Sequence, residues 1–198
     1  RKQVPTLSVK AASEFVAKYS KFTSTAYCTA GAKPVVVRAT VTGVVSEADP
    51  TIATAFCPEG RTLIGGGYSA TGRVIPIGLE RVGSNAWQVS LINRGSAEIK
   101  VTAIAICGKG SKPVAVEQRV LVKEGAATGG TTTAECKSGK KVVFAGLRAE
   151  WNTISGLNAM PTAWWRPTAT TVRATAIHDI IGPSINQSSE LVAIAYCR

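Results

Sequence analysis

The sequence has little of what enzyme active sites and metal centres are commonly built from. It contains a single histidine, His178, and it has neither a Cys-x-x-Cys pair nor a Gly-x-Ser-x-Gly elbow. Structural zinc sites bring their ligands in close pairs, whereas successive cysteines here stand at least 29 residues apart. A histidine-based mechanism also needs an orienting acid at the ring, and the adjacent Asp179 of a strand would face the other way. We therefore expect a protein that is not an enzyme and that has no cofactor and no metal.

Long apolar runs are missing as well. No stretch approaches the roughly 18 consecutive apolar residues that indicate a membrane helix, so no membrane span is expected. The chain opens on Arg1-Lys2-Gln3, and we interpret it as a mature, processed chain.

Acidic residues are few. Twelve Asp and Glu stand against 23 Lys and Arg, which gives a net charge of +11. Such a balance favours anionic partners, among them nucleic acid, acidic polysaccharide or an envelope surface, although it also serves solubility. None of the standard nucleic-acid-binding signatures is present, and the basic turn with Lys137, Lys140 and Lys141 is interpreted as a solvated surface. An anionic polysaccharide or envelope surface is thus the expected partner, and specific nucleic-acid binding is not expected.

Ala, Val, Thr and Gly are abundant, a composition typical of short strands joined by tight turns. Apolar runs of five to seven residues recur at intervals of about ten, separated by Gly, Pro, Asn and Asp. This spacing predicts an all-β protein, built as an antiparallel sandwich, barrel or prism.

Five cysteines reveal an internal repeat. Cys28 and Cys57 are 29 residues apart, as are Cys107 and Cys136, and the flanking segments agree. Two copies of one unit follow each other, which is the signature of a repeat architecture. We predict three parts: an N-terminal arm or short helix over 1–20, a first β unit over 21–107, and a second over 108–198.

Further matches align the two units. A Gly-Leu pair precedes an Ala-Trp pair in each, which predicts that Trp87 and Trp164 occupy equivalent core positions. The second unit carries about eleven extra residues, which we place around His178 to Ser189. The run Gly65-Gly66-Gly67 is interpreted as a bulge, or as a place where a backbone or a Trp ring lies against the strand. Only Gly146 of this run remains in the second unit.

The cysteine content indicates an oxidising compartment. Repeat symmetry favours pairing Cys57 with Cys107 and Cys136 with Cys197. The alternative, Cys28 with Cys57 and Cys107 with Cys136, uses the equal spacings and leaves Cys197 over. Under the favoured pairing Cys28 has no partner in its own chain, so it is either a buried free thiol or an intermolecular link.

The segment that ends in Cys28 imitates the closing strand of a unit but has no unit before it. It covers 21–28 and includes Phe22, Thr23, Ser24, Thr25, Ala26 and Tyr27. Such an orphan strand could add to the sheet of a neighbouring subunit, with or without a disulfide. It is the candidate strand-addition segment, and a homo-oligomer is expected.

Four tryptophans and several arginines could form a sugar-stacking or anion-binding face. Trp165, beside Arg166 and Pro167, is the best surface candidate. These two residues, Trp165 and Arg166, form the candidate ligand face.

One motif carries a resemblance. At Cys-Pro-x-Gly-x4-Gly-Gly-Gly, followed by an aromatic residue and a closing Ala-x-Cys strand, the chain resembles tandem β repeats of proteins secreted by bacteria, actinobacteria especially. The residues that carry it are Cys57, Pro58, Gly60, Gly65 to Gly67, Trp87 and Ala105-Ile106-Cys107. The second unit departs from the motif, with Lys137 in place of the proline. The Cys-Pro-x-Gly turn alone is similar to the β-prism of vitelline membrane outer layer proteins. The resemblance implies export and a disulfide-pinned β fold, and it brings no catalytic residues.

These observations predict a secreted, non-enzymatic structural protein, extracellular or at the cell surface. It would self-assemble, as an extracellular filament or appendage subunit joined by strand addition through the N-terminal segment. The alternative is a lectin-like module that binds carbohydrate or the cell envelope through Trp165 and Arg166.

Overall fold

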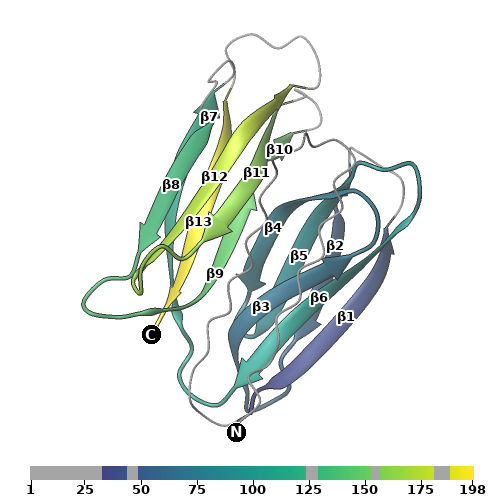
Figure 1. Ribbon diagram of the computed structural model, residues 1–198. Coiled ribbons are helices and arrows are strands. Elements are labelled where there is room, and N and C mark those ends of the chain that lie inside the picture. The colour runs from purple at the N-terminus through teal and green to yellow at the C-terminus, as the bar shows by residue number, and fades with distance from the viewer. Residues whose placement is uncertain (1–32, 44–48, 124–128, 153–156, 181–187) are drawn as a thin grey trace, which may run out of the picture. The chain divides into compact units, whose positions relative to one another are not determined.

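The computed structural model in Figure 1 describes residues 33–43, 49–123, 129–152, 157–180 and 188–198. The part from Pro34 to Arg198 forms one compact unit. Its described residues form thirteen β-strands, and all pairings among these strands are antiparallel, so the all-β prediction is confirmed. The predicted N-terminal arm or helix, the strand over 21–28 and Cys28 lie outside the described residues. Within the described ranges, no helix has the length and hydropathy of a membrane span.

The strands form three sheets. The three-stranded sheet has the order β1 (Val35–Gly43), β6 (Ile99–Gly108), β3 (Thr62–Ala70). The six-stranded sheet has the order β2 (Thr51–Phe56), β5 (Ala86–Asn93), β4 (Val74–Val82), β9 (Val142–Ala149), β13 (Ser188–Cys197), β7 (Val114–Lys123). The four-stranded sheet has the order β10 (Trp151–Asn152), β11 (Leu157–Trp165), β12 (Thr171–Ile180), β8 (Gly130–Glu135).

The same arrangement of strands occurs twice along the chain. The order β1-β6-β3 recurs as β7-β13-β9, and the order β2-β5-β4 recurs as β8-β12-β11. The registers agree, since Val35 lies opposite Cys107 and Val114 lies opposite Cys197. Even the irregularities recur, because β4 is bulged just after Pro76 and β11 just after Pro161. The six-stranded sheet therefore joins β2-β5-β4 of the first half to β9-β13-β7 of the second half, and these two parts are not equivalent in the repeat.

This register corrects the alignment based on Gly-Leu and Ala-Trp pairs. Trp87 on β5 lies opposite Ala55 of β2, and the residue in the same place of the second half, opposite Ala134 of β8, is Val172. Trp164 lies on β11, one strand away, where it pairs with Ala174 of β12. The prediction that Trp87 and Trp164 are equivalent is therefore wrong.

The reason lies in where the extra residues fall. Ala70 and Pro76 are six residues apart, whereas their counterparts Ala149 and Pro161 are twelve apart. The remaining five extra residues fall between β12 and β13, near the predicted place. Because about half of the extra residues precede β11, the alignment of Gly-Leu and Ala-Trp pairs matches Trp87 of β5 to a residue of β11 instead of β12.

On strands with one face in the core, buried and more exposed residues alternate, as expected for sheets packed face to face. On β6, every second residue from Ile99 to Cys107 is buried, and the residues between them are partly or fully exposed. Small side chains dominate the buried faces, with Ala53, Ala55 and Ala103 almost inaccessible. Alanine side chains occupy little volume, so larger side chains fill the space between the sheets. The largest of them is Trp87.

The central glycine run accommodates this tryptophan. A Cβ on Gly66 would overlap the indole ring of Trp87, and β3 has a bulge between Leu63 and Gly65. The indole Nε1 of Trp87 donates a hydrogen bond to the carbonyl of Gly67 at 3.1 Å. The interpretation of the run as a bulge and a seat for a Trp ring is confirmed.

Two disulfides lie in the described part of the chain, Cys57–Cys107 and Cys136–Cys197. These are the pairs that repeat symmetry favours, and the alternative pairing by equal spacing is wrong. Each bond fastens the residue after a short edge strand, β2 or β8, to the end of the central strand of the opposite sheet. Both therefore link the two sheets of one half.

Candidate functional site

The two halves of the compact unit join along β4 and β9. Only two residue pairs connect these strands: Gly78 with Arg148, and Leu79 with Leu147. The strands β4 and β9 lie side by side in Figure 1. Gly146 makes the close approach possible, because a Cβ on it would lie 2.5 Å from the carbonyl oxygen of Leu79. We call the β4 and β9 edges, with the side chains that pack around them, the junction.

An ion cluster lies on one face of the junction. Arg148 contacts Glu80 of β4 at 2.7 Å and Glu117 of β7 at 3.0 Å. Burial alone would lower the pKa of Arg148, but the two carboxylates outweigh burial and raise the pKa above its ordinary value. The cluster is partly exposed, so each pair contributes modestly to stability. It bridges β9 to β4 and to β7.

An aromatic cluster fills the other end of the junction. Phe144 and Tyr196 stack with ring centroids 4.1 Å apart, and each makes a T-shaped contact with Trp87 of the first half, at 5.9 and 6.4 Å between centroids. The backbone N–H of Arg81 donates to the Tyr196 hydroxyl at 2.7 Å, and its guanidinium carbon lies 5.0 Å from the ring centre. Burial raises the pKa of Tyr196 to about 12, against the opposing effect of the Arg81 hydrogen bond.

Strand β13 is consequently buried on both faces. One face contributes to the core of the second half through Leu191, Ala193, Ala195 and Cys197. The other contributes to the core of the first half through Val192, Ile194 and Tyr196. The junction is thus a packed apolar contact as well as a strand pairing.

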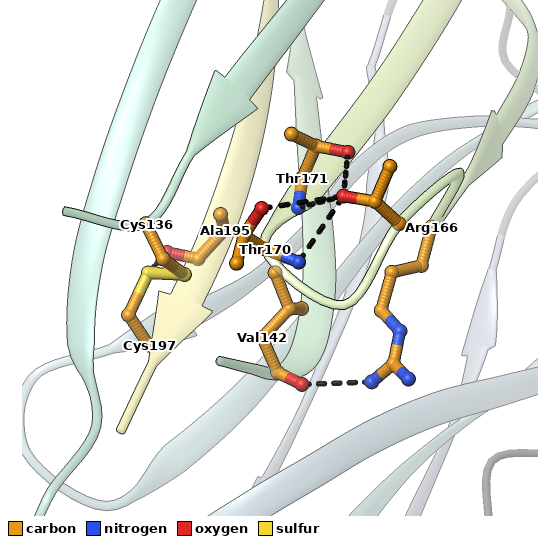
Figure 2. The surroundings of a disulfide bond; sticks show 8 residues. Cys136, Val142, Arg166, Thr170, Thr171, Ala195 and Cys197 are labelled. Carbon is orange, nitrogen blue, oxygen red and sulfur yellow. Dashed lines mark hydrogen bonds between the residues drawn. A yellow bond between two sulfur atoms is a disulfide. The ribbon is translucent and has the colours of Figure 1, made fainter. Parts of the chain in front are cut away.

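Figure 2 shows hydrogen bonds near the Cys136–Cys197 disulfide that hold a turn and two strand ends in place. The Thr168 hydroxyl accepts hydrogen bonds from the backbone N–H groups of Thr170 and Thr171, at 3.2 and 3.1 Å, and so shapes the turn before β12. Nη1 of Arg166 donates to the carbonyl of Val142 at 2.8 Å, which joins the end of β11 to the start of β9. This bond engages Arg166 with the backbone of its own chain.

The predicted ligand face is only partly assembled. Trp165 lies at the end of β11 and is 38% exposed. The guanidinium that lies over its ring belongs to Arg173 of β12, at 5.7 Å from the centroid. Trp165 and Arg173 form a small surface stack, while Arg166 points to the β9 backbone.

Two further sequence candidates are placed by strand register alone. His178 and Asp179 lie on β12 opposite Ala159 and Asn158. No group of three or more His, Cys, Asp or Glu side chains with metal-binding geometry occurs in the ranges that the structure describes. Residues Phe22 to Tyr27 and Cys28 lie outside these ranges.

Sequence reasoning missed the junction. Its key residues, Gly146, Arg148 and Tyr196, carry no motif. One signal was present: Gly146 is the only glycine of the run Gly65-Gly66-Gly67 that the second half keeps, and its counterpart by register is Gly67. Comparisons with protein-family models, with curated proteins and with solved structures found no match.

Proposed function

We propose that this chain is a secreted, non-enzymatic structural protein that self-assembles outside the cell, as a filament or appendage subunit. Its two halves are two tandem β-sandwich repeat units. The observation that carries the proposal is the junction, which uses the β4 edge of one unit and the β9 edge of the next. Contacts between non-equivalent surfaces of like units are head-to-tail, and they extend without limit when the rotation does not close a ring.

The strand predicted from sequence over residues 22–27 offers a route from two units to many. Residues 22–27 have the pattern of a closing strand without its unit, and a strand without a sheet adds to an exposed sheet edge of another molecule. Cys28 would follow it as a thiol outside the two intrachain disulfides. Both features support assembly through the N-terminal segment.

Electron microscopy of the purified chain under native conditions tests the proposal. We expect filaments or regular oligomers, and only dispersed monomers would contradict it. Thr25→Pro removes a backbone donor from the N-terminal strand and should abolish assembly through it. Thr25→Val keeps a strand-forming residue and is the control.

A carbohydrate- or envelope-binding module is the second proposal, with Trp165 as the stacking platform. The half-exposed ring and the neighbouring Arg173 support it, as does the net charge of +11 if the polysaccharide is acidic. A glycan array should then give hits that Trp165→Ala removes. An array without hits, or unchanged binding by the variant, would contradict it.

A further inference from the structure

We propose that a second copy of this chain pairs its β3 edge with the β11 edge of the first, in the register that β9 and β4 adopt at the junction. The inference rests on the self-assembly proposed above and names the surfaces that would meet. The contact would extend the four-stranded sheet into the three-stranded sheet of the next copy. It would repeat the six-stranded arrangement that the chain already contains.

The strand registers identify the equivalent residues. By register, β11 is the counterpart of β4, and β3 is the counterpart of β9. The equivalent residues are Gly78 and Ala163, Leu79 and Trp164, Leu147 and Tyr68, and Arg148 and Ser69. The intermolecular pairs would therefore be Ala163 with Ser69 and Trp164 with Tyr68.

No strand in the described ranges covers either edge where these pairs would form. Among the described residues, β3 pairs only with β6, so its outer side has no strand neighbour. The short strand β10 covers β11 only at Leu157 and Asn158, well before Ala163. An uncovered strand edge presents unpaired N–H and C=O groups to another chain.

Gly67 is the second observation. Its counterpart Gly146 must be a glycine because the β4 backbone lies against it. No described atom lies within 4 Å of the place that a Cβ on Gly67 would take. Within the described part of the chain nothing requires a glycine there, whereas a β11 strand from another copy, placed as β4 is, would require one.

The outer face of β6 is the third observation. Ile194 and Tyr196 of β13 are 1% and 2% exposed because the junction covers them. Their counterparts on β6 are Ile104 and Ile106, which are only half-buried. A second copy in the proposed place would bury these two isoleucines as the first half buries their counterparts.

The contact between copies would differ from the junction in its chemistry. At the junction Arg148 forms an ion pair with Glu80. In the contact between copies, Ser69 takes the place of Arg148 and Trp165 takes the place of Glu80. An apolar ring thus replaces a carboxylate, and this ion pair has no counterpart in the contact between copies. Because salt screens charge pairs and not apolar contacts, the association should persist at high ionic strength.

A cysteine trap tests the pairing. The Arg81 N–H points away from β5, and by alternation along β4 the backbone N–H and C=O of Leu79 point the same way, toward β9. Gly78 and Arg148 are therefore a non-hydrogen-bonded pair, in which side chains lie close. We would prepare Ser69→Cys and Ala163→Cys as separate full-length proteins, each with Cys28→Ser. Mixing them under mild oxidation should give a disulfide-linked dimer, and neither protein alone should. Thr42→Cys, on the opposite edge of the three-stranded sheet, replaces Ser69→Cys as the control.

Gly67→Val is the complementary variant. Because no described atom lies within 4 Å of a Cβ on Gly67, the monomer should keep its fold and its melting temperature within the error of the control Thr42→Val. The added side chain should reduce assembly at least tenfold, measured by sedimentation, while Thr42→Val leaves it unchanged.

The outcomes separate the two proposals. Absence of the mixed dimer, or normal assembly of Gly67→Val, would overturn the inference. If the unmodified chain still forms filaments in that case, the proposed function stands and another surface carries the contact, such as residues 22–27. If the unmodified chain stays monomeric and no trap forms, both proposals fail. If the thiol of the Ser69→Cys variant does not react with a thiol reagent, the chain's own residues cover the β3 edge. That result would also overturn the inference.

Discussion

The two equivalent glycines, Gly146 and Gly67, should respond differently to replacement by alanine. In Gly146→Ala, the new Cβ would lie 2.5 Å from the Leu79 carbonyl oxygen, well inside normal contact, so β4 and β9 must separate. Overpacking of this kind costs about 1–3 kcal/mol. The loss should lie near the middle of that range, since only two residue pairs hold the strands together and they can open. In Gly67→Ala, no described atom lies within 4 Å of the new Cβ, and the loss of chain entropy in the unfolded state should stabilise the protein by about 0.4–1 kcal/mol.

Thermal unfolding by calorimetry would measure both variants, on dilute monomeric protein. For a chain of this size, about 2 kcal/mol corresponds to a fall in Tm of roughly 4–8 °C. Gly146→Ala should show such a fall, and Gly67→Ala should melt at or slightly above the temperature of the unmodified chain. Equal destabilisation by the two substitutions would refute the reasoning, because it would mean that Gly67 is already enclosed within the monomer.

Three further predictions concern the core and the junction. Gly66→Ala should destabilise the protein by about 3 kcal/mol, since its Cβ overlaps the Trp87 ring; urea denaturation would measure this, and a neutral effect would contradict the packing. Replacing Cys57 and Cys107 together by serine opens a loop of 50 residues, and the same assay should show a loss of about 4 kcal/mol on the chain-entropy model. Because the pKa of Tyr196 is raised from 10.0 to about 12 in the folded protein, its contribution to the free energy of unfolding is complete below pH 10 and is lost as the pH rises toward 12. A spectroscopic titration should therefore show a late-ionising tyrosine that Tyr196→Phe removes, and an unchanged titration of the variant would contradict the assignment.

The fold class and the disulfides could be predicted from the sequence because both depend on local or periodic signals. Alternating apolar residues define strands, and the repeat of Cys57–Cys107 as Cys136–Cys197 follows from equal flanking segments. The equivalence of Trp87 and Trp164 could not be judged in the same way. A tryptophan is conspicuous in the sequence, but the register that places Val172 opposite Ala134 depends on hydrogen bonds between distant strands.

The junction was beyond sequence reasoning for a similar physical reason. Arg148 and Glu80 are 68 residues apart in the sequence, and they come into contact only because β9 pairs with β4. Polar residues such as Arg148 resemble solvated surface residues in a linear reading. Gly146 alone gave a hint, since a strand glycine frequently marks the close approach of another backbone.

The most direct test of head-to-tail propagation is a high-resolution electron cryomicroscopy structure of the assembled protein. We predict a continuous sheet in the order β8, β12, β11 and then β3, β6, β1 of the next copy, with Trp164 opposite Tyr68 and the Gly67 backbone against the carbonyl of Trp164. An assembly in which β3 pairs with any other segment, or in which copies meet through equivalent surfaces about a two-fold axis, would contradict it.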